Sequence, residues 1–262
     1  MKKRLMAAVL STAMAATMLL TGSISVQAAD AAAANDPAVE LIFTSVSVSG
    51  DSHTEAMYEF ADKVEELSGG SVTCKCYDNG SLFSSENEFD ALLNGDADLA
   101  YISFPTIATQ IPSYSMFASG YLFSSYEHMT SVLNGDIGLN KIRPQIEETL
   151  NIKPLSSFYL GSRVINTREK EINSYDDMNG LLLRMPNSEA WLFLGEALGA
   201  NPTPLSFSEL YTALQTGAVD AQDNPLPSIE SAKFYEVTKY IAITNHVVDS
   251  IIPCINGDTW NS

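Results

Sequence analysis

The sequence predicts an α/β protein with two lobes, each built on a mixed sheet flanked by helices, and a ligand cleft between them. Strand-like and helix-like segments alternate along most of the chain, which is typical of parallel-rich sheets. The alternation starts again after residue 160, and the segments 89–98 and 211–220 share the order aromatic-x-Ala-Leu-x-x-Gly-x-x-Asp. Paired lobes of this kind bind ligands in the crevice where their strands end.

The first 28 residues have the composition of a secretory signal peptide. Three basic residues precede an apolar run over residues 5–20, and small residues suited to cleavage end at Ala28. No cysteine lies near the cut, and no later stretch is apolar for long enough to span a bilayer. We therefore expect a periplasmic or otherwise extracytoplasmic mature chain that does not insert into the membrane and begins with a flexible segment, 29–37.

The charge of the chain narrows the class of its partners. The formal net charge is −18, and removing the three cations of the signal peptide takes it to −21. Such a chain repels nucleic acid and anionic membrane surfaces, so neither is an expected partner. An anionic ligand would need a local basic site, because the overall field repels it.

The predicted first lobe spans residues 38–160. Its expected strands are Val39–Val48, Val72–Tyr77, Leu99–Ser103 and Leu155–Leu160. Its expected helices are Asp51–Ser68, a helix that ends at Gly95, Tyr126–Leu133 and Leu139–Leu150. The segment from Ser85 to Glu88 has the pattern of a capping box, which would open the second of these helices. Residues 104–125 have no clear assignment.

The predicted second lobe spans residues 161–249, and residues 250–262 are expected to return toward the first lobe. Helix is expected over Ser174–Met178, Ser188–Leu198 and Ser206–Thr216, and a strand over Leu181–Met185. Ser206 and Glu209 have capping-box spacing and would open the last of these helices. This order again predicts a small α/β sheet.

Motifs for catalysis and metal binding are missing. The chain has no nucleophile elbow, phosphate loop, dinucleotide fingerprint or zinc-protease motif. The three histidines, His53, His128 and His246, are far apart and lack partners at ligand spacing, so structural roles are favoured. We expect no catalytic residues, no metal and no cofactor.

The three cysteines also point to structure rather than chemistry. Cys74 and Cys76 would share one face of a strand, which makes them poor partners for a disulfide with each other. Buried free thiols are the favoured interpretation, and a bridge from Cys254 to one of the pair is left open.

Arg184 stands out, because it ends the apolar strand of "GLLLRMPN" and an unpaired buried charge is costly. Pro186 and Asn187 end the strand at once, and Ser188 is placed to cap the next helix. A strand end beside a helix N-terminus is where open α/β sheets hold anions. The alternative is a salt bridge between elements.

Two further polar residues are candidates for the same site. Arg163 is expected just after an apolar strand, so two arginines could hold one carboxylate between them. Asn224 precedes Pro225 and is therefore biased toward an extended conformation, from which its amide can project. From this segment alone, an ordinary Asn-Pro turn is the favoured explanation of Asn224.

Read together, these segments resemble the solute-binding proteins of TRAP transporters, the DctP type. Seven ordered blocks between residues 177 and 246 carry the resemblance: "DMNG", "LRMP", "LGANP", "FSELY", "ALQTG", "DAQDNP" and "TNH". The N-terminal part, about Val39–Leu160, matches more loosely. The resemblance implies a two-lobed periplasmic binding protein, type II-like, that closes on a small organic acid and delivers it to TRAP transporter membrane subunits.

The resemblance also assigns ligand-binding residues. It implies that Arg184 clamps the ligand carboxylate, that Arg163 assists, that Asn224 reaches the ligand and that Phe207 packs on the ligand body. Specificity is expected to come from first-lobe positions near Val46 and Ser103. The implied solute is a sugar acid or a C4-type dicarboxylate.

The sequence departs from the family pattern in three places. Ala221 and Asp223 replace the usual glycine and glutamate beside Asn224, and "SLFSSENE" replaces a tighter turn. The chain also stops at "GDTWNS", before the last sheet crossings and the long helix of family members, so we expect a truncated product. Two rival functions are kept: a binding protein of an ABC transporter, and a secreted enzyme acting on an acidic sugar.

Overall fold

The computed structural model describes residues 39–262. The predicted signal peptide and the segment 29–37 lie outside the described residues. Within the described part, every helix is too short or too polar to cross a membrane.

The first half of the sheet is parallel at its core. Strand β1 (Val39–Thr44) pairs in parallel with β2 (Val72–Tyr77) on one side and with β3 (Leu99–Ile102) on the other. Helices α1 (Ser52–Ser68), α2 (Glu88–Asn94), α3 (Phe104–Ile107), α4 (Tyr126–Leu133) and α5 (Arg143–Leu150) flank these strands. The unassigned region 104–125 contains α3 and a 3₁₀ helix over Pro112–Ala118, and a π-helical turn over Gly138–Ile142 leads into α5.

The second half of the sheet has the same kind of core. Strand β6 (Leu182–Met185) pairs in parallel with β7 (Asn201–Pro204) and β8 (Ala221–Pro225). Helices α6 (Glu189–Ala197), α7 (Phe207–Thr216) and α8 (Leu226–Ser231) flank it. Short 3₁₀ turns lie at Tyr175–Met178 and Phe234–Glu236. Two clusters of apolar side chains cover its opposite faces, one around Trp191 and Leu183, the other around Leu210 and Phe234.

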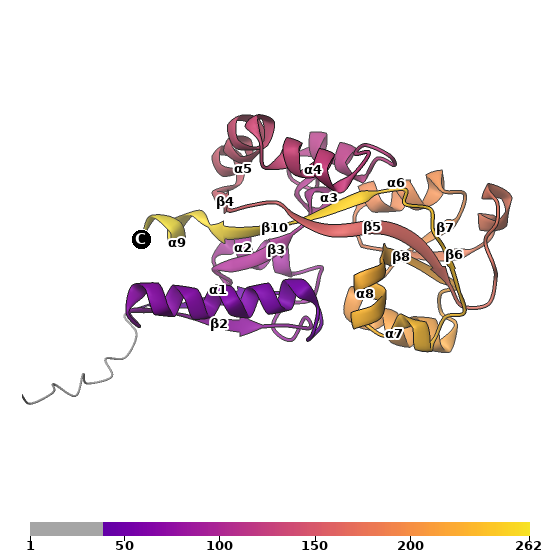
Figure 1. The fold of residues 1–262 in the computed structure, drawn as a ribbon, viewed down its shortest axis with the longest axis horizontal. Coiled ribbons are helices and arrows are strands. Elements are labelled where there is room, and N and C mark those ends of the chain that lie inside the picture. Colours follow the sequence, from indigo (N-terminus) through magenta and orange to yellow (C-terminus); the bar gives the residue numbers. More distant parts are fainter. Residues whose placement is uncertain (1–38) are drawn as a thin grey trace, which may run out of the picture. The chain divides into compact units, whose positions relative to one another are not determined.

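Two long strands connect the halves (Figure 1). Strand β5 (Phe158–Thr167) pairs with β8 and β9 (Tyr240–Ala242) at one end, and β10 (Val248–Asn256) pairs with β3 and β4 (Ile152–Pro154) at the other. The two strands also pair with each other, antiparallel, with an irregularity between Asp249 and Ser250. The sheet therefore runs without a break through both lobes, in the order β2-β1-β3-β10-β5-β8-β6-β7. The chain ends in α9 (Gly257–Asn261).

The internal sequence repeat is also a structural repeat. Helices α2 and α7 both end at a glycine in the left-handed conformation, Gly95 and Gly217. An aspartate follows in each case, and its carboxylate accepts a hydrogen bond from the neighbouring parallel strand: Asp98 from the Ile42 N–H at 2.7 Å and Asp220 from the Leu182 N–H at 3.0 Å. The repeated sequence thus encodes one device, which fixes a helix–strand junction to the next strand.

The strand that carries Arg163 was predicted in the wrong place. Residues 155–157 have no regular secondary structure, and β5 begins at Phe158. Arg163 therefore lies inside a strand rather than after its end. Gly161, which follows the predicted strand, is part of β5 with φ +136°. A Cβ atom there would come within 2.4 Å of the Pro225 side chain, so glycine allows β8 to approach closely.

Both predicted helix capping boxes fail to form as such. Helix α2 begins at Glu88, two residues later than a cap at Ser85 predicts, and its actual cap residue Asn87 makes no side-chain capping bond. At α7 the Ser206 hydroxyl donates to the Glu209 carboxylate at 2.6 Å instead of accepting from the backbone. The side chain of Glu88 is buried rather than placed at the helix end as a cap.

The three cysteines are free thiols. Cys254 lies on β10, which is separated from the β2 pair by β1 and β3. Three strand spacings amount to about 14 Å, twice what a disulfide can bridge. The open question of a Cys254 bridge is therefore answered in the negative.

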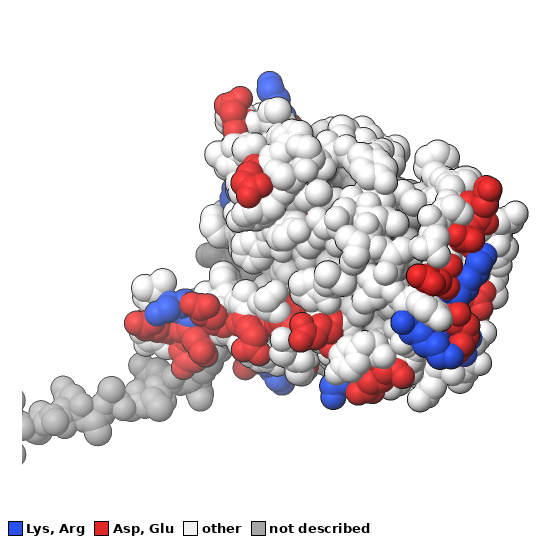
Figure 2. Space-filling view, turned by 45° about the vertical axis from the view of Figure 1, so that its right-hand side comes forward, with Lys and Arg blue, Asp and Glu red and all other residues white. Residues whose placement is uncertain are grey.

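Charged side chains are unevenly distributed on the surface. Acidic residues of α1 gather along one edge of the first lobe, and a mixed cluster lies on the second lobe, while the face between them is mostly uncharged (Figure 2). The exposed acids of α1 are Glu55, Glu59, Asp62, Glu65 and Glu66.

Candidate functional site

A cavity lies between the two lobes. Residues that follow β1 and β3 line it on one side, and Arg163, Arg184, Asn224 and Phe207 line it on the other. Its volume is about 150 Å³, which is comparable to a cavity that binds benzene. All five predicted ligand-binding residues line this one cavity, Ser103 from the first-lobe side and the other four from the second.

Arg184 is a buried cation without an acidic partner. Only 2% of the residue is exposed, and its one hydrogen bond runs from Nε to the Leu205 carbonyl at 2.8 Å. No carboxylate of the described residues lies within ion-pair distance of it, and the Phe207 ring centre is 6.0 Å from the guanidinium carbon. Burial, followed by repulsion from Arg163, lowers the pKa of Arg184 to about 10. An anion in the cavity would remove both penalties.

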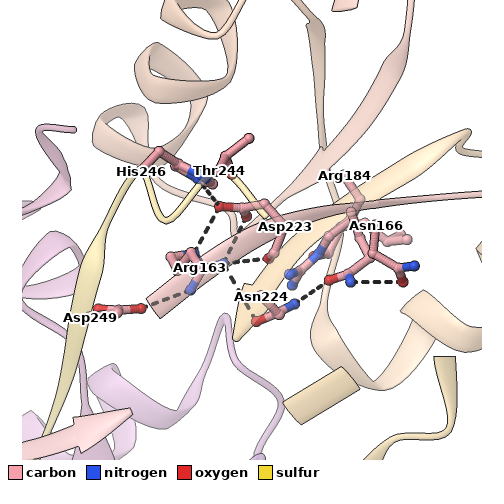
Figure 3. A network of polar contacts seen from close by, with 10 residues as sticks. Arg163, Asn166, Arg184, Asp223, Asn224, Thr244, His246 and Asp249 are labelled. Atoms are coloured by element: carbon pink, nitrogen blue, oxygen red, sulfur yellow. Dashed lines mark hydrogen bonds and ion pairs between the residues drawn. The ribbon is translucent and has the colours of Figure 1, made fainter. Parts of the chain in front are cut away.

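Arg163, in contrast, is the centre of an ion-pair network (Figure 3). Its Nε and one terminal nitrogen bind the Asp223 carboxylate at 2.8 and 2.7 Å, and the other terminal nitrogen binds Asp249 at 2.8 Å. The guanidinium also stacks on Trp191, with its carbon 4.4 Å from the ring centre. Burial opposes its charge, yet the two carboxylates raise the pKa of Arg163 above its ordinary value.

This network leaves Arg163 little to offer a ligand. A guanidinium has five N–H groups, and four of those of Arg163 face Asp223 and Asp249. The predicted two-arginine clamp is therefore uneven: Arg184 is open to the cavity, whereas Arg163 can present one N–H group. Of the network, sequence reasoning included Arg163 but missed Asp223, Asp249 and His246 as its partners.

His246 completes this network from the far side. Its Nε2 lies 3.1 Å from Asp223 and its Nδ1 lies 2.7 Å from the Thr244 hydroxyl. Burial favours the neutral acid, but Arg163 and His246 together hold the pKa of Asp223 well below its usual range. The structural role expected for His246 thus includes a specific task, which is to keep Asp223 ionised and in place.

Asn224 is positioned by a chain of side-chain amides. Its Nδ2 donates to Gln222 at 2.6 Å, and Gln222 donates to Asn166 at 3.1 Å. Gln222 is paired in register with Arg184 on β6 and with Asn166 on β5. One N–H of Asn224 remains free of this chain, so the amide can contribute one hydrogen bond at the cavity wall.

Ser103 and Phe207 contribute in different ways. Ser103 caps α3: its hydroxyl accepts from the Thr106 backbone at 3.3 Å and lies 2.9 Å from the Thr106 hydroxyl. Phe207 begins α7 and packs edge-on against Phe234, with ring centres 5.6 Å apart. The cavity therefore has a hydroxyl-bearing wall on the first-lobe side and an aromatic surface beside Arg184.

The two lobes touch at the rim of the cavity. Asp51 caps α1 by accepting from the His53 backbone at 2.9 Å, and its second oxygen accepts from the Ser231 hydroxyl of α8 at 3.2 Å. This hydrogen bond links the first-lobe wall to the second lobe. It also gives His53, whose ring nitrogen lies 3.0 Å from Asp51, the structural role expected of it.

Glu88 is a cavity-wall residue that sequence reasoning took for a helix cap. It is 4% exposed, and its Oε1 has no hydrogen-bond partner. The Thr44 hydroxyl nearby is also unpaired. Burial, opposed by Thr44, raises the pKa of Glu88 to about 8. The burial of Glu88 could not be predicted from the sequence, because glutamate is common at the start of exposed helices.

The raised pKa makes Glu88 a source of pH-dependent stability. The folded chain retains a proton that the unfolded chain releases above its ordinary pKa of 4.5, so this contribution is complete below pH 4.5 and is lost as the pH rises through about 8. Glu88→Gln should remove the dependence. The unfolding free energy of the variant, relative to the parent, should rise by about 2 kcal/mol or more between pH 5 and pH 8.5.

Chemical denaturation at both pH values measures this difference. Asp90→Asn, at an exposed acid of the same helix, is the matched control and should give a constant offset. Parallel pH profiles for the parent and Glu88→Gln would show that Glu88 is ionised in the folded protein.

Comparison with known proteins places the chain in a family. Residues 43–262 match the model of the bacterial extracellular solute-binding proteins, family 7 (DctP). The chain belongs to this family. The resemblance found in the sequence and the two-lobed α/β fold are thereby confirmed.

One curated relative of this family 7 protein is the sialic acid-binding periplasmic protein SiaP of Vibrio cholerae. The two are 35% identical over 200 residues, which cover 76% of this chain and 62% of the relative. The chain thus spans about three fifths of the length of the curated relatives that it matches.

Solved structures of TRAP periplasmic solute-binding proteins share the fold. One from Roseobacter denitrificans, with bound 3-deoxy-D-manno-oct-2-ulosonic acid, is 40% identical with a TM-score of 0.80 over 85% of this chain and 73% of that one. Another, from Sulfurospirillum deleyianum with bound succinate, is 27% identical with a TM-score of 0.81 over 86% of this chain and 72% of that one.

Proposed function

We propose that this family 7 protein is the extracytoplasmic solute-binding protein of a TRAP-type transporter and captures a carboxylate solute. The observation that carries the proposal is Arg184, a buried guanidinium that lines the inter-lobe cavity and has no acid to neutralise it. A protein retains such a charge at a cost unless a ligand compensates it. The relatives with bound solutes hold organic acids, which fits this chemistry.

Each wall residue has a part in the proposed binding mode. Arg184 binds the carboxylate with two parallel hydrogen bonds, Asn224 adds one hydrogen bond, and Phe207 packs against the body of the ligand. Arg163 acts mainly by holding β5, β8 and β10 together behind the site, and lends one N–H. Ser103 belongs to the first-lobe wall, which contacts the part of the solute away from the carboxylate and determines specificity.

The remaining parts of the proposal concern the cell. We propose secretion by the N-terminal signal peptide, delivery of the solute to TRAP membrane subunits, and binding without chemical change. The lobe boundaries at residues 160 and 249 belong to the same proposal. Because β5 and β10 cross between the lobes there, these are the segments that closure must bend.

A thermal-shift screen of sugar acids and dicarboxylates tests the function. A bound solute at a hundred times its dissociation constant should add about 2.7 kcal/mol to the free energy of unfolding. Uncharged sugars of the same size serve as the negative set. If no carboxylate shifts the transition, or if the purified protein consumes the solute that does, the proposal is wrong.

A further inference from the structure

The cavity wall is divided by charge. Its cations, Arg163 and Arg184, both come from the second lobe. The first-lobe part of the wall contains no lysine or arginine and contributes two acids, Asp51 and Glu88. One end of a ligand therefore meets Arg184, whereas the other end meets the negative charge of Asp51 and no cation.

Only one positive charge is available to a ligand. Asp223 and Asp249 already outnumber Arg163, to which both are bonded. Arg184 is the remaining cation of the wall and has no acidic partner among the described residues. One ligand carboxylate satisfies Arg184, and a second would find no unpaired cation on the described cavity wall, because Arg163 is already bonded to two carboxylates.

The first-lobe side is suited to hydroxyl groups instead. Hydrogen bonds from His53 and Ser231 overcome the effect of burial and lower the pKa of Asp51, so a fixed negative charge stays at the rim. The Oε1 atom of Glu88 lacks a partner, and Ser47 makes no side-chain donor bond. Hydroxyls both donate and accept, so they can pair with these groups, whereas a carboxylate would be desolvated beside an acid.

Building on the proposed function, we infer that the solute has one carboxylate, which meets Arg184, and hydroxyl groups at its far end, which meet the wall formed by Asp51, Glu88 and the first-lobe serines. The site excludes a solute of the same shape that carries a second carboxylate at that far end. The structure thus assigns polyhydroxylated monocarboxylates, and not dicarboxylates, as the substrate class.

Matched pairs of sugar acids test this inference. Each monocarboxylate that binds is compared by calorimetry at pH 7.5 with the diacid made by oxidising its far terminal carbon. D-gluconate with D-glucarate, D-galactonate with galactarate, and L-threonate with L-tartrate are such pairs. The monocarboxylate should bind at least a hundredfold more tightly in every pair that binds.

A charge placed on the first-lobe wall should weaken this discrimination. Ser47→Lys introduces a cation at the wall without removing a side-chain donor bond, and should shift the ratio of the two affinities at least tenfold toward the diacid. Ser81→Lys is the matched control, because it makes the same charge change at an exposed first-lobe serine that lies outside the cavity lining. It should leave the ratio unchanged.

The outcomes separate the inference from the proposed function. A diacid that binds as well as its monocarboxylate, or a screen in which only dicarboxylates bind, overturns the inference and leaves a carboxylate-binding protein. An unchanged ratio in Ser47→Lys also contradicts it, because the wall would then not face the far end. A screen without any carboxylate ligand removes the proposed function itself.

Discussion

Replacing Arg184 with methionine should abolish solute binding while leaving the ligand-free protein folded. The guanidinium has one hydrogen bond and no acidic partner, so its removal leaves no buried carboxylate unpaired. The unfolding free energy should fall by no more than about 1 kcal/mol, the net value of one hydrogen bond. The loss of binding should reach a hundredfold or more, since removing one member of a buried charge pair costs about 2–5 kcal/mol.

Calorimetry with the best ligand of the screen, together with denaturation of the ligand-free protein, gives both quantities. Arg168→Met removes an arginine of the same lobe that lies outside the cavity lining, and should bind normally. Arg184→Lys should fall between the parent and Arg184→Met, because lysine keeps the charge but cannot offer a fork. An Arg184→Met protein that binds like the parent, or does not fold, would make Arg184 a structural residue.

The same change at Arg163 should do the opposite. Arg163→Met leaves Asp223 and Asp249 buried without their shared cation, and His246 reaches only the first of them. Breaking a buried ion pair in this way costs about 3–5 kcal/mol, which should appear as a large loss of unfolding free energy without any ligand present.

A rescue variant distinguishes this cause from simple loss of packing against Trp191. Arg163→Met combined with Asp223→Asn and Asp249→Asn removes the unpaired charges and should recover part of the loss. If the single variant loses less than about 1 kcal/mol, the network does not stabilise the fold as its geometry indicates. If the triple variant recovers nothing, packing rather than charge explains the defect.

Most of the fold could be predicted from the sequence, because the patterns that indicate its helices and strands are local. Helix ends at glycines, alternating segments and the repeat around Gly95 and Gly217 each depend on residues within about ten positions. The main error concerned β5, because the apolar run over residues 155–160 was taken as a strand that ends before Gly161. Its actual role, to let Pro225 approach, depends on a contact between residues 64 positions apart, which sequence spacing cannot show.

The site was readable in part for the same reason. Arg184 was found because an arginine at the end of an apolar strand is locally unusual. Asp223 appeared only as a departure from the family pattern, and Asp249 carried no signal, since both gain their roles from Arg163 across strand pairs. Glu88 was misread, because its local pattern fits a helix cap and only tertiary packing buries its side chain.

The crossing of β5 and β10 limits how the protein can move. These two strands are hydrogen-bonded to each other and form a two-stranded hinge between the lobes. They resist sliding, because a slip of one residue would turn every side chain to the wrong face of the sheet, but the pair can bend. The irregularity in strand pairing between Asp249 and Ser250 is the point at which this hinge bends most easily. Since Asp249 also accepts a hydrogen bond from Arg163, the bending point of the hinge and the wall of the cavity share a residue. Opening and solute release should therefore be a single mechanical event.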